Sequence, residues 1–154
     1  MASVNLFASE QLTAIPFAPL KTSCAAPVQS IVLTQTQSAP HFQTTRTNFV
    51  RLTGAAQNVV VPAGTTRCVK VRLTARVSCQ GDGGNANCFL RAVANDVEMS
   101  PGAISDSGLR FSYEWVTRLD PGTHLVQIQA RRVADNAGAI IRVDDFVMDV
   151  EILK

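Results

Sequence analysis

The sequence has little charge, few lysines and no long hydrophobic run. Only 17% of its 154 residues are charged, and the formal net charge is +2. So small an excess of one sign predicts no strong attraction to nucleic acid or to anionic lipid. No run of about 18 apolar residues is present, so no segment is predicted to span a membrane. We therefore expect neither a membrane nor a direct nucleic-acid partner.

The sequence also lacks the motifs of common enzymes and metal sites. It has no Gly-x-Ser-x-Gly turn and no glycine-rich phosphate loop. The histidines His41 and His124 are not spaced as metal ligands. His124 follows the apolar alternation of a strand, which favours a hydrogen-bonded core histidine over a catalytic one. Asp144 and Asp145 are adjacent, so on a strand they point to opposite faces and cannot pair as acid and base. We predict no enzymatic activity, no catalytic residue, no cofactor and no metal ion.

The four cysteines, Cys24, Cys68, Cys79 and Cys88, allow three disulfide pairings. Cys79 and Cys88 flank a glycine-rich turn and could face each other across the mouth of one hairpin, where cross-strand distances permit a bridge. Small buried thiols are the alternative. In the turn itself, Asp82, Asn85 and Asn87 resemble loose calcium ligands, but their spacing matches no known calcium loop and a polar hairpin tip is the simpler interpretation.

Period-two alternation of apolar and polar residues dominates the sequence from Asn48 onward. It is clearest over residues 69–79, where Val69, Val71 and Leu73 alternate with Lys70 and Arg72. Such alternation predicts strands with one buried face and one solvated face. Turn signals such as Ala63-Gly64, Asn95-Asp96 and Asp120-Pro121-Gly122 separate about eight such segments. The pattern predicts an all-β sandwich or barrel.

The basic stripe on residues 70–76 has a simple structural interpretation. Lys70, Arg72 and Arg76 lack the interleaved aromatic residues of a nucleic-acid surface. We expect a solvated face, or salt bridges to Asp149 and Glu151 on a neighbouring strand.

Residues 1–45 differ from the rest of the chain. Only Glu10 and Lys21 are charged there, and Pro16 and Pro19 exclude a helix interior. We predict two parts: an extended N-terminal arm over residues 1–45, with one strand at Ser30–Gln37, and a sandwich over residues 46–154. Because such an arm cannot bury its own apolar residues, we expect six of them to contact the sandwich or a partner: Leu6, Phe7, Leu12, Ile15, Phe17 and Leu20.

Several phrases of the sequence resemble a family of jelly-roll β-sandwich modules found in secreted bacterial proteins and in phage decoration and fibre proteins. The phrases are residues 59–73, the Cys79 and Cys88 pair, residues 119–129 and residues 142–146, and the likeness covers roughly residues 49–153. The resemblance implies a jelly roll and says little about activity. The N-terminus departs from the secreted members, because Glu10 and the prolines interrupt any signal-like stretch.

Two functions follow from these observations as hypotheses. The first is a non-enzymatic phage virion component, a capsid decoration or cement protein or a tail or fibre protein. It would assemble with itself and with a major capsid or tail protein through its arm and its jelly-roll surface. The second is a secreted bacterial module that binds carbohydrate or a surface, which would place it outside the cell. The jelly-roll class often hosts lectins, but a fold alone does not decide a function.

Overall fold

The computed structural model describes residues 30–37, 42–81, 88–106, 110–133 and 138–153. These ranges contain ten β-strands. The strands are β1 (Ser30–Gln37), β2 (Phe42–Thr44), β3 (Val50–Val61), β4 (Arg67–Gln80), β5 (Cys88–Ala94), β6 (Val97–Glu98), β7 (Ile104–Asp106), β8 (Arg110–Leu119), β9 (Gly122–Arg132) and β10 (Ile140–Leu153). Within the described ranges, no helix is long and apolar enough to cross a membrane.

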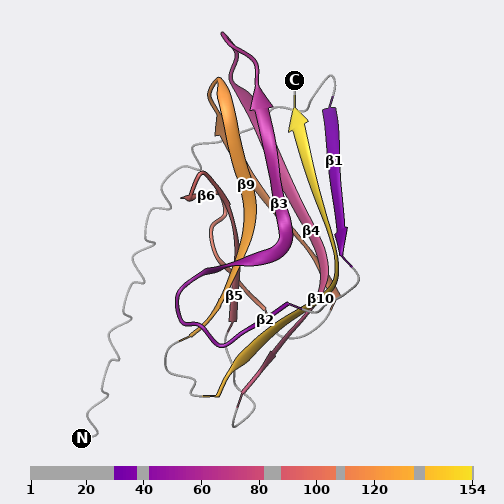
Figure 1. Cartoon of the computed structure of the whole chain (residues 1–154), viewed down its shortest axis with the longest axis vertical. Helices are drawn as coiled ribbons and strands as arrows, with labels where there is room; N and C mark the ends of the chain where they lie inside the picture. The colour runs from indigo at the N-terminus through magenta and orange to yellow at the C-terminus, as the bar shows by residue number, and fades with distance from the viewer. Residues whose placement is uncertain (1–29, 38–41, 82–87, 107–109, 134–137, 154) are drawn as a thin grey trace, which may run out of the picture.

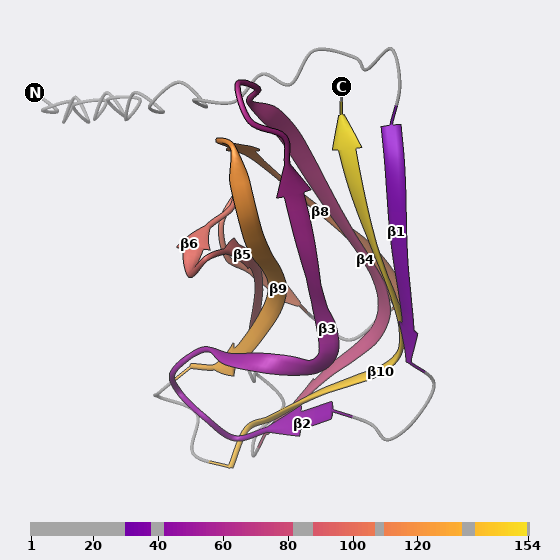
Figure 2. The ribbon, with the colours of Figure 1, turned by 45° about the horizontal axis from the view of Figure 1, so that its top comes forward.

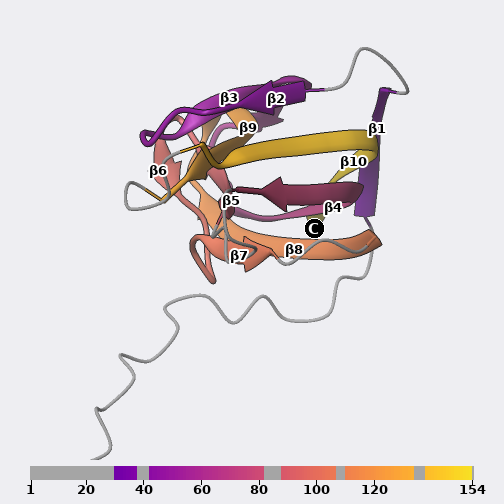
Figure 3. The same cartoon turned by 90° about the horizontal axis from the view of Figure 1, so that it is seen from below.

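The strands form two antiparallel sheets that pack as two layers (Figures 1 and 3). Sheet A has the order β1-β10-β4-β8, and β2 pairs with β10 beside β1. Sheet B has the order β3-β9-β5-β6, and β7 pairs with β5. β3 bends sharply along its length, as Figure 2 shows, so that its first residues cross the end of the sandwich while its second half runs along β9.

The pairing of the strands is nested along the chain. β1 pairs with β10, β3 with β9, β4 with β8, and β5 with β7. Long antiparallel pairs nested in this way, with consecutive pairs placed in alternate sheets, produce the two-sheet jelly roll. The predicted all-β jelly-roll sandwich is therefore confirmed.

The core lies between the two sheets and follows the alternation of the sequence. In β4 the residues Val69, Val71, Leu73, Ala75 and Val77 are all buried, and the residues between them are half-buried or exposed. Burial of a whole strand face supplies the main stabilising free energy, about 25 cal/mol for each Å² of apolar surface removed from water. Other strands contribute further buried side chains, among them Leu52, Leu90, Trp115, Ile128, Met148 and Val150.

Two irregularities change which face a strand presents. In β10 the pairing with β4 shifts between Asp144 and Val147. Val143 and Phe146, which strict alternation would place on opposite faces of the strand, are therefore both buried. Asp145 has a positive φ of 46°, as expected where an extra residue enters a strand. The two aspartates therefore lie in a bulge, which the sequence analysis did not predict. In β3 the register with β9 shifts between Arg51 and Ala56, and Gly54 has a φ of 81° there.

The N-terminal segment contributes strands to sheet A. The expected strand at Ser30–Gln37 is present as β1, and residues 42–44 form β2. Both lie on the same side of β10, with β1 opposite residues 146–153 and β2 opposite residues 141–143. The six apolar residues predicted to make arm contacts, Leu6, Phe7, Leu12, Ile15, Phe17 and Leu20, lie outside the described residues.

Candidate functional site

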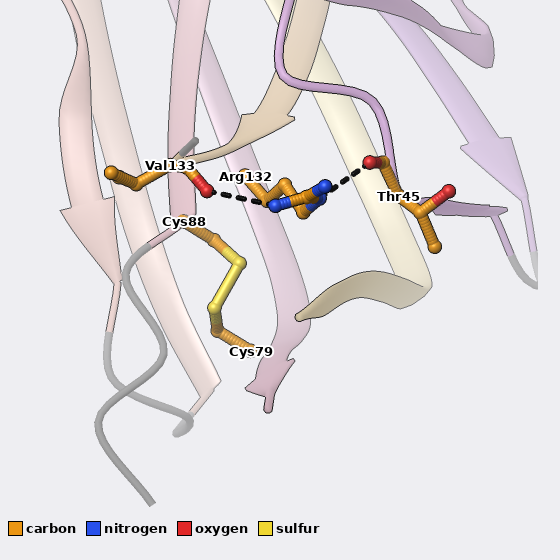
Figure 4. Close-up of a disulfide and its surroundings, with 5 residues drawn as sticks. All are labelled: Thr45, Cys79, Cys88, Arg132 and Val133. Atoms are coloured by element: carbon orange, nitrogen blue, oxygen red, sulfur yellow. Dashed lines mark hydrogen bonds between the residues drawn. A yellow bond between two sulfur atoms is a disulfide. The ribbon is translucent and has the colours of Figure 1, made fainter. Parts of the chain in front are cut away.

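A disulfide joins Cys79 at the end of β4 to Cys88 at the start of β5 (Figure 4). Its Cα atoms are 5.8 Å apart, and the bridge links sheet A to sheet B. Cys68 is disulfide-bonded as well. Beside the bridge, the Arg132 side chain donates hydrogen bonds to the carbonyl oxygens of Thr45, at 2.6 Å, and Val133, at 3.1 Å (Figure 4). This end of the sandwich is therefore fastened by covalent and polar contacts.

The outer face of sheet A carries the basic stripe, and carboxylates neutralise it. Lys70 pairs with Glu151 at 2.7 Å, as the sequence analysis expected. Arg72 pairs with Glu114 at 3.3 Å, and the Arg76 and Asp145 charges are 3.9 Å apart. These partners come from the flanking strands β8 and β10. The stripe is thus a solvated face crossed by ion pairs.

His124 lies at the opposite end of the sandwich from the Cys79–Cys88 bridge and is half-buried. Its Nε2 lies 2.8 Å from the Asp120 carbonyl oxygen, and its Nδ1 lies 3.2 Å from the Asn95 side-chain nitrogen. Because the Leu125 amide donates to Asn95 Oδ1, the Asn95 nitrogen must face the histidine. Asn95 therefore donates to Nδ1, and Nε2–H donates to the carbonyl. The expectation of a half-buried, hydrogen-bonded histidine agrees with this geometry.

A shallow hollow of about 240 Å³ opens beside His124 between the two sheets. One wall comes from Ala94 and Val97, and the other from Thr117 and Leu119. Of the polar groups at its rim, His124 and Asn95 bond each other and Asp120 Oδ1 accepts from Thr66, while Arg118 is exposed. The hollow therefore offers few free hydrogen-bonding groups to a ligand.

The outer face of sheet B is different, because it gathers arginine, phenylalanine and glutamine side chains. Alternation along β5 and β9 turns Leu90, Ala92, Ile128 and Ala130 into the core and the residues between them outward. In the cross-strand register, Phe89 lies opposite Arg131, and Arg91 opposite Gln129. Gln129 in turn lies opposite Arg51 of β3. We call these side chains, together with the ring of Phe49, the Phe–Arg face: Phe49, Arg51, Phe89, Arg91, Gln129 and Arg131.

Contacts within the Phe–Arg face hold its side chains in fixed positions. The guanidinium carbon of Arg91 lies 3.9 Å from the centroid of the Phe49 ring. That of Arg131 lies 4.9 Å from the Phe49 centroid and 5.1 Å from the Phe89 centroid. Arg91 also donates to Gln129 Oε1 at 2.9 Å and to Glu98 at 2.8 Å. A guanidinium group that is stacked on a ring and hydrogen-bonded to two separate acceptors is well ordered.

The sequence contained the parts of this face but no sign of their assembly. Gln127, Gln129 and Arg131 alternate visibly along β9, yet they meet residues 49–51 and 89–91 only through the sheet. The positions singled out as a loose calcium loop, Asp82, Asn85 and Asn87, lie outside the described residues, as does His41. Within the described ranges, no group of three or more His, Cys, Asp and Glu side chains is placed to hold a metal ion.

Comparisons with known proteins bear on the fold alone. No protein-family model matches the chain, and no curated protein matches it significantly. Dimeric latent PorU from Porphyromonas gingivalis is 11% identical over 85% of this chain, with a TM-score of 0.42. A family 35 carbohydrate binding module from Clostridium thermocellum is 15% identical over 78% of this chain and 90% of its own, with a TM-score of 0.34. A structure of infectious bursal disease virus, Gx strain, is 15% identical over 92% of this chain and 42% of its own, with a TM-score of 0.38. This chain spans only 14% of the PorU chain.

Proposed function

We propose that this chain is a non-enzymatic binding module that holds a carbohydrate on the outer face of sheet B. The observation that supports the proposal is the Phe–Arg face. Carbohydrates are bound by side chains that combine flat apolar surface with planar hydrogen-bonding groups, and this face supplies phenyl rings and guanidinium groups. The Gln129 amide is buried beneath them and accepts a hydrogen bond from Arg91. Its side chains lie on strands of a rigid sheet, which positions a binding group more precisely than a loop does.

The disulfides support the location of such a module in an oxidising environment. Cys79 and Cys88 are bridged, and Cys68 is also disulfide-bonded. Disulfides persist outside the cell, in the periplasm and on virion or cell surfaces, and are rare in the cytosol. An extracellular location and a virion location both agree with this chemistry.

Binding of the full chain to a glycan array, in buffers with calcium and with a chelator, tests the proposal. We expect hits that survive the chelator and are lost in the variant Phe89→Ala. The variant Arg142→Gln, which changes an exposed residue on the outer face of sheet A, is the control and keeps the hits. An array without hits, or hits that Phe89→Ala leaves untouched while the protein stays folded, would argue against carbohydrate binding on this face.

A structural role in a virion is the second candidate, and the position of β1 favours it. β1 is the edge strand of sheet A, and residues 1–29 precede it in the sequence. An N-terminal arm that leaves from a sheet edge could engage a neighbouring copy, a major capsid protein or a tail protein without disturbing the core.

The test is a deletion that ends before β1. Removal of residues 2–29 leaves β1 and β2 in place, whereas a deletion of residues 1–45 would remove two strands that pair with β10. We expect the shorter chain to fold, by thermal unfolding, and to lose oligomerisation or incorporation into particles. Normal assembly of this truncated chain would rule out the arm as the assembly element.

A further inference from the structure

We infer that the ligand of the Phe–Arg face is a negatively charged saccharide, one that carries carboxylate or sulfate groups. This inference rests on the proposed carbohydrate-binding function and adds the charge of the ligand to it. The observation behind it is an imbalance of charge on this one face of the molecule.

The imbalance follows from the partners of three arginines in two neighbouring cross-strand rows. Arg91 is neutralised by Glu98 at 2.8 Å. Arg51 is exposed, and among the described residues neither Arg51 nor Arg131 forms an ion pair with a carboxylate. Asp96, the other acid nearby, accepts a hydrogen bond from Gln127, which lies one row beyond Gln129 on the same strand. Three guanidinium groups thus share one carboxylate.

The outer face of sheet A shows the contrast within the same molecule. Its three cations on β4, Lys70, Arg72 and Arg76, each have a carboxylate within 4 Å. The stripe on β4 is thus neutralised, although Arg118 and Arg142 on the flanking strands of the same face are exposed and form no ion pair among the described residues. An unneutralised pair of arginines on the other sheet is the arrangement expected where a ligand supplies the missing negative charge.

Arg131 is also held in place before any ligand arrives. Its guanidinium group lies beside the rings of Phe49 and Phe89, and its Nη1 lies 3.5 Å from the Thr47 carbonyl oxygen. Its Nε is buried and has no hydrogen-bond partner. A guanidinium group that is partly desolvated and fixed loses little rotational freedom on pairing, and its planar fork matches the geometry of carboxylate and sulfate oxygens. The half-buried Phe89 ring beside it supplies apolar surface for a sugar ring, whereas the Phe49 ring is already covered by the guanidinium group of Arg91.

The experiment is a calorimetric titration of the full chain with three probes of equal length. They are an oligogalacturonate, its uncharged methyl ester, and an oligosaccharide without carboxylates that carries sulfate groups. We expect at least one anionic probe to bind roughly tenfold or more tightly than the neutral one, a difference of about 1.4 kcal/mol in binding free energy. The preference should shrink at about 1 M salt, where the screening length falls to about 3 Å.

Two substitutions that each remove one positive charge test whether the preference for the anionic probe comes from this face. Arg51→Gln, at an exposed position, is expected to weaken binding of the anionic probe roughly tenfold and to leave the methyl ester unchanged. Arg142→Gln on sheet A is the matched control and is expected to change neither. Because Arg131→Gln can disturb the packing of both phenyl rings, Arg131→Lys serves beside it and should retain the charge but lose part of the affinity.

The outcomes separate the two proposals. Equal binding of the anionic and neutral probes would overturn the inference about charge and leave carbohydrate binding standing. Binding of an anionic probe that Arg51→Gln and Arg142→Gln weaken equally would also overturn it, because the effect would then come from net charge. Absence of binding to all three probes and to the glycan array would remove the proposed function itself.

Discussion

The guanidinium carbon of Arg91 lies 3.9 Å from the centroid of the Phe49 ring, although Arg91 belongs to β5 and Phe49 leads into β3. Strand β9 lies between these two strands in sheet B. The contact therefore crosses a whole strand and fastens the sharply bent start of β3 to the middle of the sheet. Arg131 of β9 lies beside the same ring, so one phenyl group connects three strands.

Replacement of Phe49 should therefore loosen the first half of β3. We expect Phe49→Ala to lower the free energy of unfolding by about 2 kcal/mol, from lost apolar burial and two lost cation–π contacts. Phe49→Leu keeps much of the burial and should cost about 1 kcal/mol. Urea denaturation of the three proteins provides the measurement. An alanine variant as stable as the wild type would show that the ring is not a structural link.

Trp115 is expected to be the most sensitive single position of the core. Its side chain is fully buried in β8, and its Nε1–H donates to the Gly102 carbonyl oxygen at 2.8 Å. Trp115→Phe should cost about 2 kcal/mol, because the ring shrinks and the half-buried Gly102 carbonyl loses its donor. Trp115→Ala should cost about 4 kcal/mol. Denaturant titration followed by circular dichroism measures both, and a cost for Trp115→Phe below about 0.5 kcal/mol would contradict the role of the hydrogen bond.

The Cys79–Cys88 bridge should stabilise the sandwich through the denatured state. The two residues are nine positions apart, and closing a loop of about this length removes roughly 2–3 kcal/mol of chain entropy from the unfolded ensemble. We expect the double variant Cys79→Ala, Cys88→Ala to lose about that much stability in non-reducing urea titrations. If reductant destabilises this variant as well, the additional loss reports the bridge at Cys68. Unchanged stability of the double variant would show that the bridge does not form in solution.

Asn95 combines a backbone requirement with a side-chain requirement, and two substitutions separate them. Its φ is 48° and that of Asp96 is 64°, the conformation of a tight hairpin turn. Asn95→Gly keeps this conformation but removes the bonds to His124 and the Leu125 amide, for a cost of about 1–2 kcal/mol. Asn95→Ala should cost about 1 kcal/mol more, because alanine disfavours a positive φ. Equal stability of the two variants would show that backbone strain contributes nothing here.

The hydrogen bonds of His124 predict one tautomer of the neutral ring. The Asp120 carbonyl oxygen can only accept, so Nε2 carries the proton, and Nδ1 accepts from Asn95. Long-range nitrogen–proton correlation spectra distinguish the two tautomers directly. We expect the Nε2–H form in the wild type and also in Asn95→Gly, because the bond to the Asp120 carbonyl oxygen remains. The Nδ1–H form in the wild type would reverse the assignment of the Asn95 amide.

Local pattern was enough to predict the strands and the sheet faces. The alternation in residues 69–79 placed every buried side chain of that part of β4 correctly up to Val77, and Ser30–Gln37 was predicted to the residue. The pairing of Lys70 with Glu151 followed from the charges of two strands. These predictions succeeded because strand periodicity and turn chemistry are properties of neighbouring residues.

The candidate site could not be predicted in the same way. Phe49, Phe89 and Arg131 are far apart in the sequence and meet only because β3 and β5 flank β9. The bulge at Asp144–Asp145 was visible in principle, since Val143 and Phe146 are both apolar while strict alternation allows only one of them to face the core. The bend in β3 depends on how the sheets close over each other. Register and closure are set by packing between distant segments, which a single sequence does not display.

The position of β10 has a consequence for how the protein is made. β10, which follows all the other described strands along the chain, fills the middle of sheet A, between β4 on one side and β1 and β2 on the other. Until it is synthesised, β1 and β2 lack their partner in sheet A and one edge of β4 is unpaired, and exposed strand edges are prone to pair with other chains. A nascent chain interrupted before β10 is therefore expected to aggregate, and production of this protein should depend on prompt translation of this strand.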